Sequence, residues 1–275
     1  MIDEYLKLGL VNRLKITKKT PQGFYLSSLD EDSVLFPNKY ITKDMVIGDV
    51  IDVFIYNDSK DRYIATTKIP KYKYNEFGVF KVVDVTKFGV FVDWGLEKDL
   101  FVPLSNIKKE LQKNDFVIGK IVYDEKTDRL LLDTKIMRHI KKAKDYKKND
   151  EVDILVIAKT PLGYKCIVDN LYEGMLFENE IFEHIRIGDK RKAYIKQNRN
   201  DGKLDLSLRK IGEGETQKIF NKLKHMKSTK ITTKSSPEDI KKEFNVSKKM
   251  YKKAINELKA QNKIYQIDDV IYIKE

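Results

Sequence analysis

Residues whose types could support catalysis are scattered through this sequence. His139, His184 and His225 lie far apart and match no metal-ligand spacing such as His-Glu-x-x-His. The single cysteine, Cys166, stands in the strand-like run Lys165-Cys-Ile-Val with no histidine nearby, which is typical of a buried structural thiol. Neither a Gly-x-x-x-x-Gly-Lys loop nor a Gly-x-Gly-x-x-Gly loop occurs. The sequence therefore predicts a protein without catalytic residues, bound metal or cofactor.

Two acidic clusters leave one enzymatic alternative open. Asp30-Glu-Asp and Asp124-Glu are the residue types that hold Mg²⁺ in a nuclease. Acids in turns are usually solvated, so a nuclease is the weaker interpretation. Sequence alone does not exclude it, because distant acids can converge in a fold.

Composition points to a polyanionic partner. The chain has 275 residues, with 54 Lys plus Arg against 42 Asp plus Glu, a formal charge of +12 and a pI of about 9.3. One cysteine excludes a disulfide scaffold and a cysteine-based zinc site. The first ten residues carry two acids and no basic region, unlike a signal peptide, and no run of about 18 apolar residues could span a membrane. We therefore expect a soluble cytoplasmic protein with no membrane partner.

A short motif recurs three times and identifies an internal repeat. The pattern Thr-x-x-Gly begins at Thr20, Thr86 and Thr160, at offsets of 66 and 74 residues. The same offsets align an aspartate in all three repeats, at Asp49, Asp115 and Asp189. They also align an isoleucine, at Ile41, Ile107 and Ile181. Four columns agree without a gap, so the repeat is genuine.

Each repeat ends alike, with a polar turn followed by a strand-like run. These endings cover 56–68, 123–135 and, more loosely, 200–210. Short alternating runs within each repeat are separated by turn glycines. Five short strands cannot fill two sheets, so a small antiparallel barrel is favoured. Because a domain this small buries only about 60% of its unfolded surface, we expect the modules to lean on one another or on their linkers.

After Lys210 the alternation typical of strands gives way to helical spacing. A Gly-rich hinge at 211–216 precedes a helix expected over 216–226. Ser236, followed by proline, starts a second helix that ends near 244–245, and Ser247 caps a third that ends at 261–262. Residues 264–273 are expected to form two short strands. Three helices followed by a two-stranded ribbon is the winged-helix layout.

The third of these helices is the expected recognition helix. Its predicted apolar face consists of Met250, Ala254, Ile255 and Leu258. Its predicted polar face carries Lys248, Lys249, Lys252 and Lys253. Residues 213–275 contain 15 Lys and no Arg against 9 acids, which is +6 of the total charge. The four lysines are candidate nucleic-acid contacts. For each of these lysines taken alone, it is an equally good explanation that the residue simply occupies a solvent-exposed helix face.

The second repeat carries the most informative segment. It reads Thr86-Lys-Phe-Gly-Val-Phe-Val-Asp-Trp-Gly and is followed by Leu100-Phe-Val-Pro-Leu-Ser-Asn-Ile. This segment strongly resembles the S1 RNA-binding domain, a five-stranded OB-fold. The resemblance implies that Phe88 and Phe91 stack on bases. Single-stranded nucleic acid exposes flat π-faces, and each stacked base contributes about 1–3 kcal/mol.

A basic rim would then follow the phosphates. Lys87, Lys120 and Arg129 are the candidates for this rim, and the resemblance places the residue matching Arg129 on the binding face, close to the acid that Asp124 matches. Trp94, at an expected strand end, is either a base-stacking residue or an anchor against a neighbouring module.

All three repeats depart from the S1 pattern. S1 domains often have a histidine on the binding face, whereas this chain has Pro37, Pro103 and Phe177 at the matching positions. The remaining binding positions differ as follows: repeat one has Gln22, Tyr25 and Arg62, and repeat three has Leu162, Lys165 and Lys203. Tyr25, Arg62, Phe177 and Lys203 are therefore secondary candidates for RNA contact. Repeat two has the best set for stacking, and repeat three is expected to bind phosphates or to serve in packing.

Three such repeats and a winged helix resemble the CvfB (conserved virulence factor B) family of bacterial S1 proteins over essentially the whole chain. The expected fold is mainly β with a small α+β C-terminal domain: three tandem S1-like OB-fold barrels at 1–70, 71–142 and 146–211, followed by a winged helix at 214–275. The resemblance implies a non-catalytic protein that binds single-stranded RNA and regulates gene expression post-transcriptionally. Two alternatives stay open: a regulator that binds DNA through the winged helix, and an adaptor that docks on ribosome, polymerase or another protein.

Overall fold

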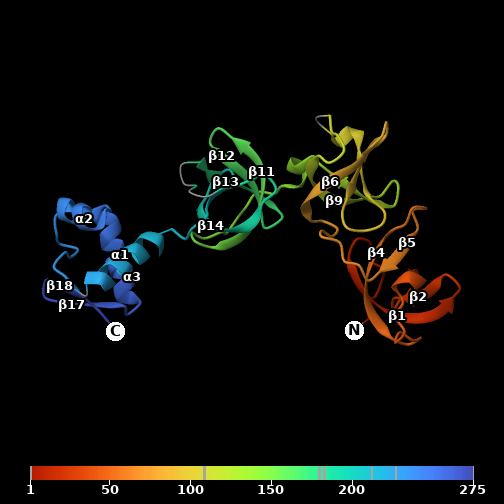
Figure 1. Ribbon diagram of the computed structural model, residues 1–275, viewed down its shortest axis with the longest axis horizontal. Helices are drawn as coiled ribbons and strands as arrows, with labels where there is room; N and C mark the ends of the chain where they lie inside the picture. The colour runs from red at the N-terminus through yellow and green to blue at the C-terminus, as the bar shows by residue number, and fades with distance from the viewer. Residues whose placement is uncertain are drawn as a thin grey trace. The chain divides into compact units, whose positions relative to one another are not determined.

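The computed structural model describes residues 2–107, 110–178, 181, 184–211, 213–226 and 228–274. The chain divides into two compact units. The first contains residues 1–141 with the short segments 155–157 and 186–190, and the second contains the remainder. Figure 1 shows β-structure along most of the chain and three helices in its C-terminal region. The predicted class, mainly β with three five-stranded barrels and a C-terminal winged helix, is confirmed.

The three barrels share one topology. In each, the first three strands form an antiparallel meander, and the fifth strand pairs in parallel with the third. The fourth strand lies between the fifth and the first and closes the barrel. The first barrel consists of β1 (Val11–Thr20), β2 (Gly23–Ser27), β3 (Ser33–Pro37), β4 (Val50–Asn57) and β5 (Tyr63–Thr66). The second consists of β6 (Phe77–Val85), β7 (Gly89–Asp93), β8 (Leu100–Pro103), β9 (Phe116–Asp124) and β10 (Arg129–Asp133). The third consists of β11 (Glu151–Thr160), β12 (Gly163–Val168), β13 (Tyr172–Phe177), β14 (Lys190–Asn198) and β15 (Leu204–Ser207).

Among the described residues, short 3₁₀ turns accompany the first two barrels. They are η1 (Asn38–Tyr40) after β3, η2 (Leu104–Asn106) after β8 and η3 (Ile136–His139) after β10.

The threonine of the repeated motif has the same structural role in every barrel. Its Oγ1 donates a hydrogen bond to the carbonyl oxygen of the glycine three residues later, at 2.9 Å from Thr20, 2.9 Å from Thr86 and 3.0 Å from Thr160. The glycine lies against the backbone of the neighbouring strand: a Cβ on Gly23 would come within 2.1 Å of the Phe36 carbonyl oxygen. The motif therefore fixes the tight turn between the first two strands, where a side chain has no room.

The aspartate column is also structural. The carboxylates of Asp49, Asp115 and Asp189 each accept a hydrogen bond from the backbone N–H three residues earlier, at 2.9, 2.9 and 2.8 Å. This arrangement fixes the turn that leads into the fourth strand, as aspartate commonly does in turns. The repeated residues that define the sequence pattern thus maintain the turns of the barrels.

The C-terminal region has the three expected helices, but the first begins at 213, within the segment predicted as a Gly-rich hinge. They are α1 (Glu213–Met226), α2 (Pro237–Phe244) and α3 (Lys248–Ala260). Ser236 caps α2 and Ser247 caps α3, each accepting a hydrogen bond from the backbone N–H three residues on. The wing is β17 (Ile264–Ile267) paired with β18 (Val270–Ile273). A third strand, β16 (Ser228–Thr229), which was not predicted, pairs with β18.

The core of this region corrects two details of the helix prediction. Tyr251 is fully buried, whereas Met250, which was expected on the apolar face, is only half-buried. The hydroxyl of Tyr251 donates to the Ile231 carbonyl oxygen at 2.7 Å, which lets a polar aromatic residue occupy the core. Met226, expected on the apolar face of the first helix, is exposed at the end of α1.

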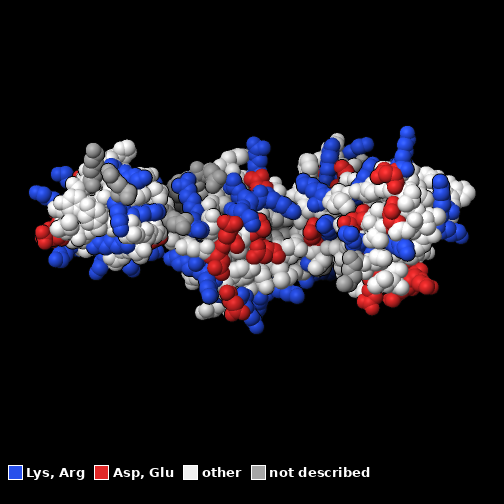
Figure 2. All heavy atoms as spheres, turned by 90° about the horizontal axis from the view of Figure 1, so that it is seen from below, with Lys and Arg blue, Asp and Glu red and all other residues white. Residues whose placement is uncertain are grey.

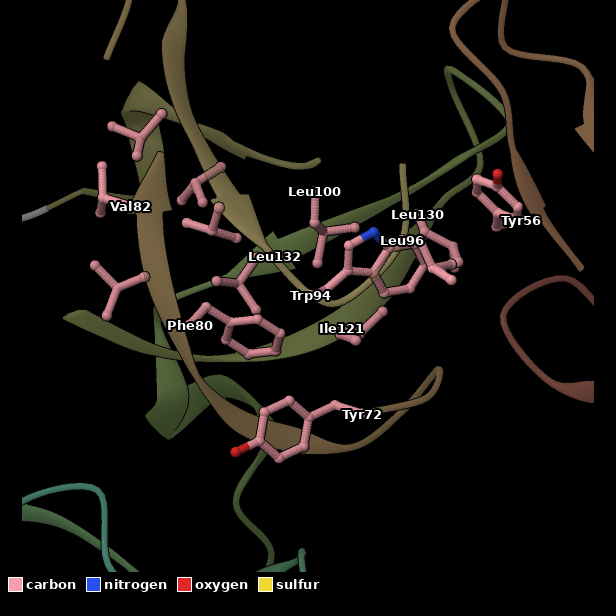
Figure 3. Close-up of a cluster of buried hydrophobic side chains, with 14 of the residues drawn as sticks. Tyr56, Tyr72, Phe80, Val82, Trp94, Leu96, Leu100, Ile121, Leu130 and Leu132 are labelled. Atoms are coloured by element: carbon pink, nitrogen blue, oxygen red, sulfur yellow. The ribbon is translucent and has the colours of Figure 1, made fainter. Parts of the chain in front are cut away.

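Within the first unit, a tryptophan of the second barrel packs against the first barrel. Trp94 of the second barrel is only 4% exposed and lies edge-on to Phe54 and Tyr56 of β4, with ring centroids 5.8 and 6.4 Å apart. Figure 3 shows its indole beside Leu96 and Leu100, with Tyr56 coming from the neighbouring barrel. Of the two roles considered for Trp94, the structure therefore supports the anchor between modules and not the base stack.

Candidate nucleic-acid interface

The outer face of the second barrel carries a ladder of apolar side chains across three strands. Phe91 of β7 pairs with Phe101 of β8, which pairs in turn with Leu131 of β10. The two phenylalanine rings lie at 5.2 Å between centroids with an interplanar angle of 49°. All three side chains are half-buried, so their outer faces remain open to a ligand.

This ladder forms part of a surface pocket of about 320 Å³. The pocket is lined by Ser59, Asp61, Phe91, Lys98, Asp99, Phe101, Pro103, Asp124, Thr127, Arg129, Leu130 and Leu131. Two of these, Ser59 and Asp61, come from the turn between β4 and β5 of the first barrel. The site is thus built on the second barrel and completed by the first.

Asp61 from that turn joins the two cations of the pocket. Its carboxylate lies 3.0 Å from the Arg129 guanidinium and 2.5 Å from the Lys98 ammonium. Lys98 also donates to the Asp58 carbonyl oxygen at 2.7 Å. Arg129, which the sequence assigned to a phosphate-binding rim, therefore already forms an ion pair with an acid of the protein itself.

Further acids flank the aromatic ladder. Asp84 of β6 lies opposite Phe91 in the strand register, and Asp93 and Asp99 follow along the same edge. Burial, together with the nearby charges of Asp93 and Asp84, raises the pKa of the Asp99 carboxyl above its ordinary value. The face therefore has cations at one end and carboxylates at the other.

Phe88 lies at the tip of the turn before β7 and is 71% exposed. The ammonium of Lys87 lies over its ring, 5.0 Å from the centroid. Both side chains are thus accessible, as the prediction of nucleic-acid contact requires, but Phe88 does not line the pocket around Phe91.

Lys120 is not in the expected place. Its side chain is only 5% exposed, with the ammonium 5.0 Å from the centre of the Phe77 ring. Burial, and then the charge of Lys141, lowers its pKa. Its strand pairs it with Phe77 and Asp133, away from the Phe91 ladder, so the prediction that it belongs to an exposed rim is wrong.

The first barrel has the same ladder positions with weaker stacking residues. Tyr25 pairs with Leu35, which pairs with Ile64, so one aromatic ring takes the place of two. Arg62 is exposed, and its guanidinium binds Asp58 through two nitrogens, at 2.7 and 3.0 Å. The position of Tyr25 on the ladder suits contact with a base, whereas the Arg62 guanidinium is bound by Asp58 of the same β4–β5 turn.

The third barrel has a polar ladder. Lys165 pairs with Met175, which pairs with Asp205. The buried carboxylate of Glu173 lies 3.7 Å from the Lys165 ammonium and 3.3 Å from that of Lys203. The two cations expected to meet phosphates are thus partly neutralised by one acid.

Phe177 occupies the expected position of the third barrel. It lies opposite Gly163, just as Pro37 lies opposite Gly23 and Pro103 opposite Gly89. Its ring is half-buried, with the Lys196 ammonium 5.7 Å from its centroid.

The recognition helix α3 presents three of its four candidate lysines to solvent. Lys249, Lys252 and Lys253 are exposed on one face, at the spacing that brings side chains together on a helix. Lys248 is half-buried and donates to the Lys234 carbonyl oxygen at 3.5 Å. Within the described residues, no carboxylate lies within 4.0 Å of the three exposed ammonium groups. On the face that Figure 2 shows, basic side chains predominate over the C-terminal region, at the left of the view.

The residues considered for catalysis are dispersed in the structure. Cys166 is buried, which raises its thiol pKa to about 12, and His139 contacts Asp133 at 2.8 Å. Among the described residues no cluster of three or more His, Cys, Asp or Glu has an arrangement suited to a metal ion. No helix in the described part of the chain is long and apolar enough to cross a membrane.

Sequence reasoning missed Phe101, Lys98 and Asp61. Phe101 could have been found, because it lies two residues before Pro103 in a strand, and alternate residues share a face. Asp61 could not, because its place depends on how two barrels pack.

Comparison with known proteins identifies the modules. The S1 domain model matches residues 8–68, the S1 RNA binding domain model matches 81–160, and the CvfB-like winged helix domain model matches 217–273. The chain is 28% identical to the YitL protein of Bacillus subtilis (strain 168), over 99% of this chain and 96% of that protein.

Further relatives cover nearly the whole chain. Conserved virulence factor B of Staphylococcus epidermidis (strain RP62A) is 24% identical over 91% of this chain and 89% of its own length. A crystal structure of a multidomain protein with nucleic acid binding domains from Streptococcus pneumoniae TIGR4 aligns with 97% of this chain and 98% of that chain, at 24% identity and a TM-score of 0.42.

Proposed function

This chain belongs to the CvfB family of S1-domain proteins and is a nucleic-acid-binding protein, and from that premise we propose that its ligand is single-stranded RNA held by the second barrel. The observation that carries the proposal is the pair Phe91 and Phe101, two adjacent aromatic rings open on one side of a pocket. Bases in a duplex are already stacked on each other, whereas a single strand can place its bases on protein rings.

The charges of the site agree with a base, rather than a phosphate, in the pocket. Lys98 and Arg129 are paired with Asp61, while Asp99 and Asp124 also line the cavity. A carboxylate repels a phosphate but accepts hydrogen bonds from the N–H groups of a base edge. The phosphates would follow the exposed Lys87 and the outer edge of Arg129.

The test is the affinity for labelled RNA measured by fluorescence anisotropy across a salt series, with the matching single-stranded DNA and a duplex DNA as competitors. The double variant Phe91→Ala with Phe101→Ala removes both rings. If it removes one stacked base, affinity falls by about 5-fold to 150-fold. This loss persists at high salt, because stacking does not depend on counterion release.

The matched control is Phe116→Ala. Phe116 is an exposed phenylalanine in the same barrel, but it does not line the pocket. Equal losses for Phe116→Ala and the double variant, or preference of the wild type for duplex DNA, would contradict the proposal.

We also propose that the protein does not cut its RNA and acts on gene expression after transcription, as the family resemblance implies. Labelled RNA incubated with the protein and Mg²⁺ should stay intact on a denaturing gel. Cleavage would revive the nuclease alternative.

A second candidate function, duplex DNA binding, is favoured by the exposed lysines of α3. Replacing Lys249, Lys252 and Lys253 by Gln in the full chain distinguishes the two. If DNA binding through α3 is the main activity, the triple variant loses duplex affinity while Phe91→Ala with Phe101→Ala keeps it.

A further inference from the structure

A second aromatic site lies in the first unit, away from the Phe91 ladder. It is a groove of about 340 Å³ lined by Tyr5, Leu6, Lys7, Leu8, Leu10, Tyr63, Tyr74 and Tyr123, which we call the tyrosine groove. Its walls come from the N-terminal segment, β5, the segment before β6, and the end of β9. None of its residues belongs to the Thr-x-x-Gly motif or to the S1-type binding positions.

Three tyrosines of the groove are open to solvent. Tyr5, Tyr74 and Tyr123 are 53%, 38% and 40% exposed. Exposed aromatic residues scattered singly over a surface are ordinary, but several tyrosines gathered around a leucine-lined hollow form a surface suited to binding.

The groove is rigidly built. The backbone N–H of Tyr74 donates to the Gly9 carbonyl oxygen at 2.9 Å, and Gly9 N–H donates to Ile55 of β4 at 2.8 Å. Gly9 has a φ of 76°, and a Cβ there would lie 2.7 Å from the Cβ of Tyr74. The side chain of Asn12 additionally holds both Lys7 and Leu10 through their backbones. A preformed groove loses little entropy when it binds a ligand.

Two of the rings are oriented by one carboxylate. The hydroxyls of Tyr63 and Tyr123 both donate to Asp128 Oδ1, at 2.7 and 2.8 Å. Burial and then the bond to Asp128 raise the pKa of Tyr63, and the bond to Asp128 raises that of Tyr123. Both phenols therefore stay neutral, and their ring positions are fixed.

The groove lies close to the proposed RNA site along the chain. Tyr123 lies directly opposite Leu130 in the β9–β10 register, and Leu130 lines the pocket of Phe91. Asp128, which orients the groove tyrosines, is the neighbour of Arg129, which lines that pocket. Tyr123 and Leu130 share one face of the β9–β10 hairpin and the ladder residue Leu131 lies on the other, so a strand that reaches both sites passes around this hairpin. An OB-fold engages on the order of 4–16 nucleotides, so one strand is long enough to reach both.

We propose that the tyrosine groove binds a base of the same RNA strand that stacks on Phe91 and Phe101. This inference rests on the proposed function of the second barrel. The tyrosine and leucine side chains of the groove match the flat apolar faces of a base, and the nearness of the first site, through Asp128 and Arg129, selects RNA over an unrelated peptide. The first two barrels thus form one extended RNA-binding unit.

The test is a length series of single-stranded RNA oligonucleotides, from about four nucleotides, which fill one site, to about sixteen. The variant is Tyr5→Ala with Tyr74→Ala, which keeps the Cβ of Tyr74 against Gly9 and removes two exposed rings. Wild-type affinity should rise with length, and the variant should lose about 5-fold or more on the longest RNA while matching the wild type on the shortest.

Phe116→Ala again serves as the control for loss of an exposed ring. A variant with the wild-type length dependence, or with equal loss at every length, would overturn the inference while leaving the proposed function intact. Failure of the proposed function looks different: the wild type would show no salt-resistant RNA affinity at any length.

Discussion

Neutralising Asp61 tests whether the cations at the edge of the second barrel's pocket lie on the path of the RNA backbone. Asp61 holds Arg129 and Lys98 in ion pairs, and the structure predicts that its removal makes these cations available to phosphates. Asp61→Asn is the suitable change, because Asp61 has a φ of 61° and asparagine tolerates this left-handed conformation better than most residues.

The magnitude follows from counterion release. On single strands each phosphate contact contributes about 0.7 to the slope of log affinity against log salt. Arg129 alone would therefore steepen the slope by about 0.7, and Arg129 with Lys98 by about 1.4. Between 50 and 200 mM salt, the variant should lose about threefold to sevenfold more affinity than the wild type. At the lowest salt it should bind more tightly than the wild type.

The assay is the anisotropy titration with labelled single-stranded RNA at four or more salt concentrations. Asp52→Asn is the matched control, because it changes the net charge equally but frees Arg13 on the first barrel, where the ion pair is long, at 3.6 Å, and exposed. A slope for Asp61→Asn equal to that of the wild type or of Asp52→Asn would refute the reasoning, because Arg129 and Lys98 would then lie off the path of the RNA.

Three further predictions concern the framework. Trp94→Ala should lower the free energy of unfolding by about 3–5 kcal/mol in a denaturant titration, because it empties the contact between two barrels, whereas Trp94→Phe should cost less. Cys166, with a pKa of about 12, should resist a thiol reagent in the native protein and react once urea unfolds it; rapid native labelling would argue against its burial. Burial alone would raise the pKa of Asp58, but hydrogen bonds from Arg62 and from backbone N–H groups hold it below its ordinary value. The stabilisation of the folded protein by the ionised Asp58 carboxylate is therefore complete above about pH 4, and it is lost as the pH falls through the lowered pKa of Asp58 in the folded state. Asp58→Asn should cost about 1 kcal/mol or less at pH 7, since Arg62 is exposed, and the difference from the wild type should vanish in acid.

The turns and barrels were predictable because local chemistry specifies them. Thr86 and Gly89 fix a turn through one hydrogen bond, and Ser247 caps a helix with its own side chain. Such features depend on residues three or four apart, so their signature is visible in the sequence. The same holds for Phe91, whose place follows from the alternation of its strand.

The environment of the site was not predictable, because it depends on contacts between distant segments. Lys120 and Phe54 both lie on fourth strands, yet Lys120 lies against Phe77 while Phe54 faces the second barrel at Trp94. A repeat alignment identifies equivalent positions but does not say which face a neighbouring module covers. Asp61 shows the same limit, since its partners are 37 and 68 residues away.

The three barrels show how one backbone acquires different uses through a few outward-facing positions. The ladder is Tyr25, Leu35 and Ile64 in the first barrel; Phe91, Phe101 and Leu131 in the second; and Lys165, Met175 and Asp205 in the third. Inward residues must keep a core packed, so they change little in character, whereas outward residues are free to differ. The second barrel alone has two adjacent rings on this ladder, and the first has given the outer face of β4 to the contact with Trp94. Aromatic rings are therefore concentrated on the ladder of the second barrel, to whose pocket the first barrel contributes Ser59 and Asp61 instead of further rings.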